Sequence, residues 1–368
     1  MVSRGTIVYF QFLAILATAL LWGICLANGG VKALLLAVWH GRLSDDIPLR
    51  RLYLGFPPLD YLIALLVAFF FHGTTSHHED YHLFLVDAYS ALQPAFVWLY
   101  VEAARSGAKP SWVQRPIIFA TLWQCFGGAI ALPLYYMVHL PWAGTGGCSR
   151  VRNTEQAFAI PFSFLVGAVL PAIVGMGTRW FSPGTRSSDM HQHILGLWQL
   201  DPVWVSCMQI ILSKAYAAIW HSNRNLGSSK NTNGQGGYFW ISTAYLVAAA
   251  MSGAGHLYTV SKIATHDNPG GVFANMYIPW PLGALSGGQD VFVFSPWLFL
   301  QYDYIIISLS SLSWVYYLLQ IAPRHNRPSP QALALILLLG SVTFGAGTTV
   351  SLALWYRETK LLVHERSD

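Results

Sequence analysis

Residues 296–321 read PWLFLQYDYIIISLSSLSWVYYLLQI, a run whose single charged side chain is Asp303. A membrane-crossing α-helix needs about 20 consecutive apolar residues, and this run exceeds that length. Similar runs recur along the chain, which is 54% hydrophobic and 10% charged, whereas soluble domains have roughly 25% charged residues. The sequence therefore predicts an all-α protein, a polytopic transmembrane helical bundle without a soluble domain able to fold alone.

Nine apolar segments have the length of a membrane-crossing helix. They are 7–26, 57–73, 81–104, 116–140, 155–177, 201–222, 238–260, 296–321 and 330–356. The count falls to eight if the second segment, or the one from residue 201, does not cross. We expect one domain over 1–368, with a flexible loop at 223–237 and a loop rich in Gly, Pro and aromatic residues at 264–295. The second loop either covers a cavity mouth or is anchored at the membrane interface by its aromatic side chains.

The positive charges are divided unevenly between the two sides of this nine-segment arrangement. The richer side includes the C-terminus, so the positive-inside rule makes that side cytoplasmic and places the N-terminus in the lumen. We expect a multi-pass protein of the endoplasmic reticulum membrane. The net charge of +5 is spread over many short loops, which argues against nucleic acid as a partner.

Motifs for metals and cofactors are missing. The pair Asp45 and Asp46 lacks the later carboxylate that magnesium-dependent diphosphate ionisation would need. His78 and His82 have the spacing of one histidine box of a membrane di-iron oxygenase, but the later histidines are scattered. There is also no P-loop and no convincing dinucleotide fingerprint. We therefore predict no metal site and no cofactor.

Acidic residues inside the apolar segments are the first candidates for function, because an ionised group near the bilayer centre costs several kcal/mol. The candidates are Asp60, Asp87, Glu102, Glu155, Asp201 and Asp303. Asp303 lies about two turns inside its segment, between two tyrosines and with no basic residue in the same segment. Burial against a cavity or another helix explains it best, and Asp87 is placed similarly.

Simpler explanations compete for the other acids. Asp201 precedes a proline at a helix start, where N-capping explains it. Glu102 lies one turn from Arg105 and is expected at the membrane interface. Asp60 follows a proline pair, so polarity at the helix start is an equally good explanation.

Alternating helix directions bring several of these groups toward one end of the bundle. The predicted cytoplasmic end receives Asp60, Glu102, Asp201, His256 and Asp303, whereas Asp87 lies nearer the lumenal half. We expect a shared cavity that opens to the cytoplasmic leaflet. His256 follows small residues that allow close helix packing, and a hydrogen-bonded core histidine explains it equally well.

Aromatic side chains make up 14% of the chain, and those near the candidate acids are predicted to bind substrate. They are Trp198, Trp204, Tyr258, Trp297, Phe299, Tyr302, Tyr304 and Trp314. An aromatic wall stabilises a carbocation through cation–π attraction and excludes water. Interfacial belts and lipid-facing packing are the competing explanation for such residues.

Three segments carry a resemblance to a known family: WQLDPVWVS (198–206), SGAGHLY (252–258) and FLQYDYIIISLSSLSWVYY (299–317). Together with the length and the multi-span pattern, they resemble the fungal integral membrane terpene cyclases of the ascochlorin, ascofuranone and macrophorin meroterpenoid pathways. The resemblance implies metal-independent cyclisation of the prenyl tail of a lipophilic, farnesyl-type meroterpenoid precursor. The reaction would start by protonation of a terminal epoxide or alkene.

This chemistry suits a buried carboxylic acid, which can deliver a proton without a metal when an apolar cavity keeps it neutral. Asp303 is the expected acid, and Asp201, His256, Asp60 and Asp87 are candidate assistants or bases. The alternative is a transporter or exporter of a lipophilic metabolite with proton-coupling carboxylates, although no internal repeat supports it. The ring product, the trigger, the final base and the oligomeric state stay open at this point.

Overall fold

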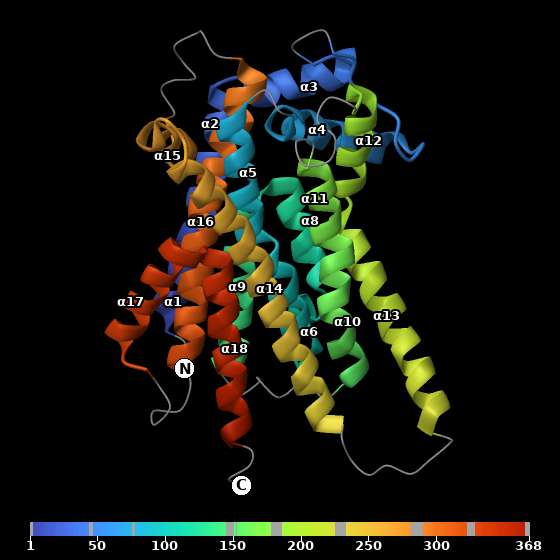
Figure 1. The fold of residues 1–368 in the computed structure, drawn as a ribbon, viewed down its shortest axis with the longest axis vertical. Coiled ribbons are helices and arrows are strands. Elements are labelled where there is room, and N and C mark those ends of the chain that lie inside the picture. The colour runs from blue at the N-terminus through green and yellow to red at the C-terminus, as the bar shows by residue number, and fades with distance from the viewer. Residues whose placement is uncertain are drawn as a thin grey trace.

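The structure is a computed structural model. It describes residues 3–43, 47–75, 78–144, 151, 153–177, 186–224, 233–280, 290–321 and 328–364. Within these ranges every regular element is a helix, apart from an isolated bridge between Arg42 and Pro48. The all-α prediction is confirmed, and Figure 1 shows the long helices packed side by side along the bundle.

Six helical stretches among the described residues are long and apolar enough to cross a membrane. They are Arg4–Ala27 (α1 Arg4–Thr18, η1 Ala19–Gly23, α2 Ile24–Ala27), Pro57–Thr74 (α4), Glu79–Ala104 (α5 Glu79–Leu92, α6 Pro94–Ala104), Thr154–Met176 (α10 Thr154–Phe164, η3 Leu165–Val169, α11 Leu170–Met176), Asp201–Ile219 within α13 (Asp201–Arg224), and Val291–Ile321 (α16). These six coincide with six of the nine predicted segments.

The remaining helices cover the other three predicted segments and the connections. They are α3 (Gly30–His40), α7 (Ser111–Gln114), α8 (Pro116–Phe126), α9 (Gly128–Trp142), α12 (Ser188–Trp198), α14 (Asn233–Ala264), α15 (Pro269–Tyr277), α17 (Pro330–Phe344) and α18 (Ala346–His364). Figure 1 shows α3 lying across the upper end of the bundle. Residues 225–232 and 281–289, the central parts of the two predicted loops, lie outside the described residues.

The predicted segment 116–140 is not one straight helix. Its two parts, α8 and α9, meet at Gly127, whose φ of 103° is readily adopted only by glycine. The rings of Phe119 in α8 and Tyr135 in α9 lie 5.1 Å apart, whereas a straight helix would separate these residues by about 24 Å. The two helices therefore form an antiparallel hairpin, and the prediction of a single crossing here is wrong.

The predicted segment 330–356 reverses in the same way. Its two parts, α17 and α18, meet at Gly345, where φ is 87°. A Cβ placed on Gly340 would lie 3.0 Å from Oγ1 of Thr349, although a straight helix would hold these residues about 13 Å apart. This segment is a second helical hairpin, again turned by a glycine.

The first helix begins and the last helix ends toward the same end of the bundle. Tyr9 in α1 hydrogen-bonds Ser313 in α16 at 2.9 Å. Arg357 in α18 donates to Glu102, which also accepts from His139, and His139 accepts from Trp314, the residue after Ser313 in α16. Figure 1 likewise shows α1 beginning and α18 ending toward the lower end of the bundle. The nine-segment arrangement expected opposite sides, and the hairpins alone do not change that, because removing two crossings from nine leaves an odd number.

Candidate active site

Asp303 lies on α16 against the tip of the α8/α9 hairpin. The carboxyl is buried, and its Oδ1 accepts a hydrogen bond of 2.7 Å from the backbone N–H of Ala129. A Cβ on Gly127 would come within 2.9 Å of the same oxygen and 2.7 Å of Leu21. Glycine therefore lets the N-terminus of α9 approach the acid. Among the described residues, no cation lies at ion-pair distance from Asp303.

Asp303 opens onto an apolar cavity of about 190 Å³ lined by η1, α2 to α5, the α8/α9 tip and α16. The aromatic lining residues are Trp22, Phe69, Phe70, Tyr89, Trp123, Phe299 and Tyr304. The rings of Trp22 and Phe69 meet Phe299 edge-on, with centroids 5.7 and 5.3 Å away. The cavity thus combines one unpaired acid with aromatic walls, as a hydrocarbon-binding site for acid chemistry requires.

Asp87 is placed differently, because each of its oxygens already has a partner. His256 Nδ1 lies 2.8 Å from Oδ1, and the hydroxyls of Tyr277 and Tyr304 donate to Oδ2 at 2.7 and 3.1 Å. The other ring nitrogen of His256 faces the Val342 carbonyl at 3.3 Å. Asp87 therefore fixes the hydroxyl end of Tyr304, whose side chain lines the Asp303 cavity.

The prediction that Asp87 and His256 lie in opposite halves of the bundle is wrong, since they are in direct contact. The α8/α9 hairpin does not cross, so α14 runs antiparallel to α5, whereas the nine-segment arrangement made the two parallel. Small residues then allow close packing of α5 and α14: a Cβ on Gly255 would lie 1.8 Å from Ser90 Oγ. The α17/α18 tip also packs here, with Gly345 against His256.

Two further candidate acids lie outside the cavity lining. Asp60 accepts the backbone N–H groups of Tyr53 and Leu54 at 3.0 and 2.6 Å, so it stabilises the chain that leads into α4. Asp201 is buried at the start of α13, and within the described part of the chain its Oδ1 has no hydrogen-bond partner. Trp198, three residues before Asp201, packs on the cavity-lining ring of Tyr89 at 4.6 Å. Asp201 thus lies close to the wall of the cavity.

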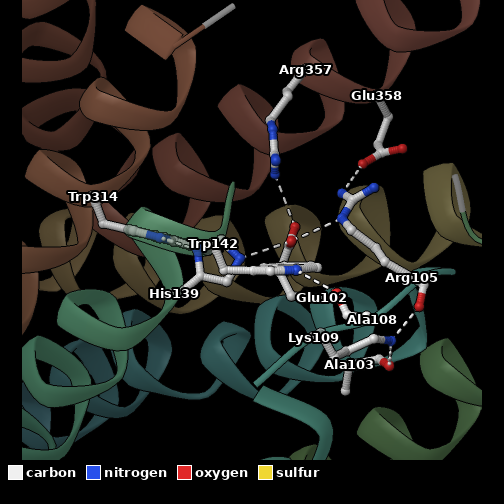
Figure 2. A network of polar contacts seen from close by, with 10 residues as sticks. All are labelled: Glu102, Ala103, Arg105, Ala108, Lys109, His139, Trp142, Trp314, Arg357 and Glu358. Carbon is white, nitrogen blue, oxygen red and sulfur yellow. Dashed lines mark hydrogen bonds and ion pairs between the residues drawn. The ribbon is translucent and has the colours of Figure 1, made fainter. Parts of the chain in front are cut away.

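Glu102 is completely buried rather than interfacial, and it lies at the centre of an ion network (Figure 2). Its Oε2 accepts from Arg105 at 2.8 Å and from His139 at 2.9 Å, and its Oε1 accepts from Arg357 at 2.9 Å. Arg105 also pairs with Glu358. The network is far along α16 from Asp303, so the predicted single shared cavity does not include Glu102.

The protonation of His139 follows from its neighbours. The Trp314 indole N–H, which can only donate, points at His139 Nδ1 over 3.1 Å. Nδ1 must therefore accept, and the proton on Nε2 is donated to Glu102. With a neutral histidine, two arginines balance two glutamates, and the network joins α6, α9, α16 and α18 at the base of both hairpins (Figure 2).

The predicted substrate-binding aromatics are spread over several places. Phe299 and Tyr304 line the Asp303 cavity, Tyr258 lines a second cavity, and Trp297 lines a third, more polar one. The other four line none of these cavities. The Trp198 ring packs against Tyr89 with centroids 4.6 Å apart, and Trp314 hydrogen-bonds His139 of the ion network. Trp204 donates to the Leu197 carbonyl, and Tyr302 is the fourth.

Sequence reasoning missed Tyr89, Trp22 and the α8/α9 tip. The Phe-Gly-Gly triplet at 126–128, inside an apolar run, was the signal that could have indicated the turn. Histidines of the di-iron hypothesis do not converge: His82 Nδ1 faces the Gly73 carbonyl at 3.3 Å, and His191 Nε2 bonds the Thr74 hydroxyl at 2.8 Å. No three His, Cys, Asp or Glu side chains among the described residues lie where they could hold a metal ion.

Comparison with known proteins gives this geometry a context. A family model described as the CtvD domain matches residues 6–362. The chain belongs to this family. The CtvD-domain protein is 25% identical to terpene cyclase DEP1 of Fusarium langsethiae, over 98% of this chain and 99% of the relative. Terpene cyclase alnG of Emericella nidulans is 25% identical over 94% of this chain and 92% of the relative. Terpene cyclase ascI of Acremonium egyptiacum is 27% identical over 79% of this chain and 72% of the relative.

These findings confirm the resemblance to fungal membrane terpene cyclases, and the CtvD-domain protein is an enzyme of the cyclase type. The transporter alternative is not favoured. No solved structure matches the chain.

Proposed function

We propose that this CtvD-domain protein cyclises the prenyl tail of a meroterpenoid precursor after Asp303 protonates a terminal epoxide or alkene. One observation carries the proposal: a buried carboxyl, with no cation paired to it in the described part of the chain, opens onto an aromatic-lined apolar cavity. A buried charge normally has a partner. An acid that lacks one, and that faces space for a hydrocarbon, is suited to be neutral and to donate a proton.

The hairpin tip supports the proton transfer in two ways. Oδ1 of Asp303 accepts the Ala129 N–H, so the acidic proton of the neutral group belongs on Oδ2. When that proton leaves, the negative charge stays next to the N-terminus of α9, where the helix dipole stabilises an anion. Asp303 can therefore be neutral before the reaction and stabilised as a carboxylate after it.

The transferred proton forms an O–H bond on an epoxide, whose C–O bond then breaks, or a C–H bond on an alkene. In both cases the electron deficit moves to carbon, and a second double bond of the prenyl chain attacks it to close a ring. The faces of Trp22, Phe69 and Phe299 stabilise the cation through their π electrons. Loss of one proton from carbon restores neutrality, so the overall step is an isomerisation.

We assign the final proton to Asp201, whose buried Oδ1 has no hydrogen-bond partner among the described residues. Tyr89 lines the cavity together with Asp303 and packs on Trp198, three residues before Asp201, which suits it to return the proton between turnovers. Asp87 and His256 act on Tyr304 rather than on the substrate, and Asp60 holds the start of α4.

The proposed substrate is a lipophilic molecule with a farnesyl-type tail, taken up from the endoplasmic reticulum membrane. The six apolar stretches are compatible with a multi-pass protein. In this arrangement the hairpins α8/α9 and α17/α18 enter from one side and return to it, because the Glu102 network joins both hairpin bases.

Replacement of Asp303 by Asn tests the proposal, since it keeps the shape and removes the acid. We expect cyclisation of a farnesylated phenol, or of its terminal epoxide, to fall by about 100-fold or more in detergent-purified protein. The control is Asp267→Asn, which changes an exposed acid and should leave the rate unaltered. A normal rate in Asp303→Asn would rule out this acid, and wild-type protein inactive on every prenylated substrate would rule out the function.

A further inference from the structure

A second apolar cavity, of about 240 Å³, lies between α5, the α10–α11 stretch and α14. Its lining includes Phe164, Val169, Ala172, Met251 and Tyr258. The hydroxyl of Ser90 at its edge donates to its own helix, to the Val86 carbonyl at 2.6 Å. The cavity therefore offers mainly hydrocarbon surface, which fits an apolar ligand.

The second cavity and the Asp303 cavity meet at one side chain. Among the described residues, only Tyr89 lines both of them. Its ring packs between Trp198 at 4.6 Å and Phe70 at 5.8 Å. Rotation about the side-chain bonds of Tyr89 would therefore join the two cavities.

The wall of the second cavity contains an irregular helical turn. Leu165–Val169 form the π-helical segment η3, and such single turns occur often at functional sites. Gln93 donates to the Ala168 carbonyl in this turn at 3.2 Å. Gly167 packs directly on α13, because a Cβ there would lie 2.6 Å from the backbone nitrogen of Val205. The wall is thus held on both sides and keeps Val169 toward the cavity.

Size argues that one cavity cannot hold a farnesyl-type chain. A cavity of about 150 Å³ in another protein holds one benzene molecule, which has six carbons. The Asp303 cavity, at about 190 Å³, therefore takes about eight carbons, enough for the terminal isoprene unit and the nearer double bond of the next unit, which react together. A chain of three isoprene units needs further apolar space, and the second cavity provides it directly behind Tyr89.

We propose that the second cavity binds the part of the isoprenoid chain that does not react, while the chain's terminal unit lies beside Asp303. The chain passes the Tyr89 ring, so the second cavity sets the chain length that the enzyme accepts. This inference rests on the proposed cyclase function and adds a binding site to it.

Ala172→Phe tests the inference, because Ala172 is buried and lines only the second cavity of these two. We expect kcat/KM for a farnesylated phenol epoxide to fall by at least about tenfold, since the added ring overfills the space. The same measurement with a geranylated phenol epoxide, which is one isoprene unit shorter but keeps the second double bond needed for ring closure, should change less than about twofold. Ala218→Phe, on the exposed face of α13, is the matched control.

The outcomes separate the two proposals. Suppose that wild-type protein cyclises both substrates. If Ala172→Phe then lowers kcat/KM equally for both, or leaves both values unchanged, the second-cavity inference is wrong and the cyclase function stands. If wild-type protein cyclises no prenylated substrate, the proposed function itself fails.

A binding measurement covers the case in which Ala172→Phe does not fold. A farnesylated phenol with a diazirine on its unit nearest the ring should label peptides from α11 and α14 in wild-type protein. Labelling confined to α4 and α16 would overturn the inference. So would labelling of α11 and α14 by a diazirine phospholipid that excess farnesylated phenol does not displace, because the cavity would then be a lipid site.

Discussion

Glu102 and Asp303 are both buried carboxyl groups in apolar helices, but their surroundings differ completely. Glu102 contacts two arginines and a histidine that donates to it. Asp303 accepts a hydrogen bond from the backbone N–H of Ala129 and faces a cavity. A buried acid whose charge is fully paired stabilises the fold, whereas one that is unpaired beside open space can exchange a proton with a ligand.

The two hairpin tips repeat this contrast. Gly127 brings backbone donors to an acid for which the described residues supply no other hydrogen-bond partner, and Gly345 packs against His256, whose two ring nitrogens already face acceptors. The same network around Glu102 anchors the bases of both hairpins. One buried ion cluster can therefore position the α8/α9 tip and the α17/α18 tip together.

Glu102→Gln should have the largest effect, and it should fall on stability. It leaves Arg105 and Arg357 without their central partner, and breaking such a buried pair costs about 3–5 kcal/mol. We expect a large drop in the thermal unfolding temperature of the detergent-purified protein, with cyclase rate per folded molecule within a few-fold of wild type. Glu155→Gln, at the start of α10, is the control. An unchanged unfolding temperature would mean that the network is not a stabilising element.

Gly127→Ala should have the next largest effect, and it should fall on activity. The Cβ would meet Asp303 Oδ1 at 2.9 Å and Leu21 at 2.7 Å, at a φ of 103°. Strain of this kind is about 1–3 kcal/mol, and it displaces the acid. We expect kcat to fall by about tenfold to 100-fold. Gly23→Ala, where an added Cβ meets nothing within 4 Å, should keep full activity; equal activity in both variants would argue against positioning by the tip.

The sequence was sufficient for the all-α fold class and for the burial of Asp303. An isolated acid inside a long apolar run has few explanations, and helical periodicity does not depend on tertiary detail. Helix direction could not be predicted from the sequence. An apolar run with a central glycine is long enough for a membrane-crossing helix whether it crosses or turns back. The reversed direction after Gly127 misplaced His256 relative to Asp87. Tyr89 and Trp22 could not be singled out, since only packing distinguishes a cavity-lining ring from any other aromatic.

Tyr304→Phe should have the smallest effect. The ring still lines the cavity, and only one of the donors to Asp87 is lost. A hydrogen bond to a charged group contributes about 1.5–3 kcal/mol, part of which Tyr277 and His256 retain. We expect KM for the prenylated substrate to rise a few-fold with little change in kcat. A fall in kcat as large as that of Asp303→Asn would instead make Tyr304 a proton donor.

The most direct test measures single-turnover cyclisation and thermal unfolding on the same purified preparations of wild type, Asp303→Asn and Glu102→Gln. We expect Asp303→Asn to unfold at or above the wild-type temperature and to form almost no cyclised product. Glu102→Gln should unfold much earlier and, below that temperature, still form product. A preparation of Asp303→Asn that is folded and cyclises its substrate at the wild-type rate would contradict the central role given to this carboxyl group.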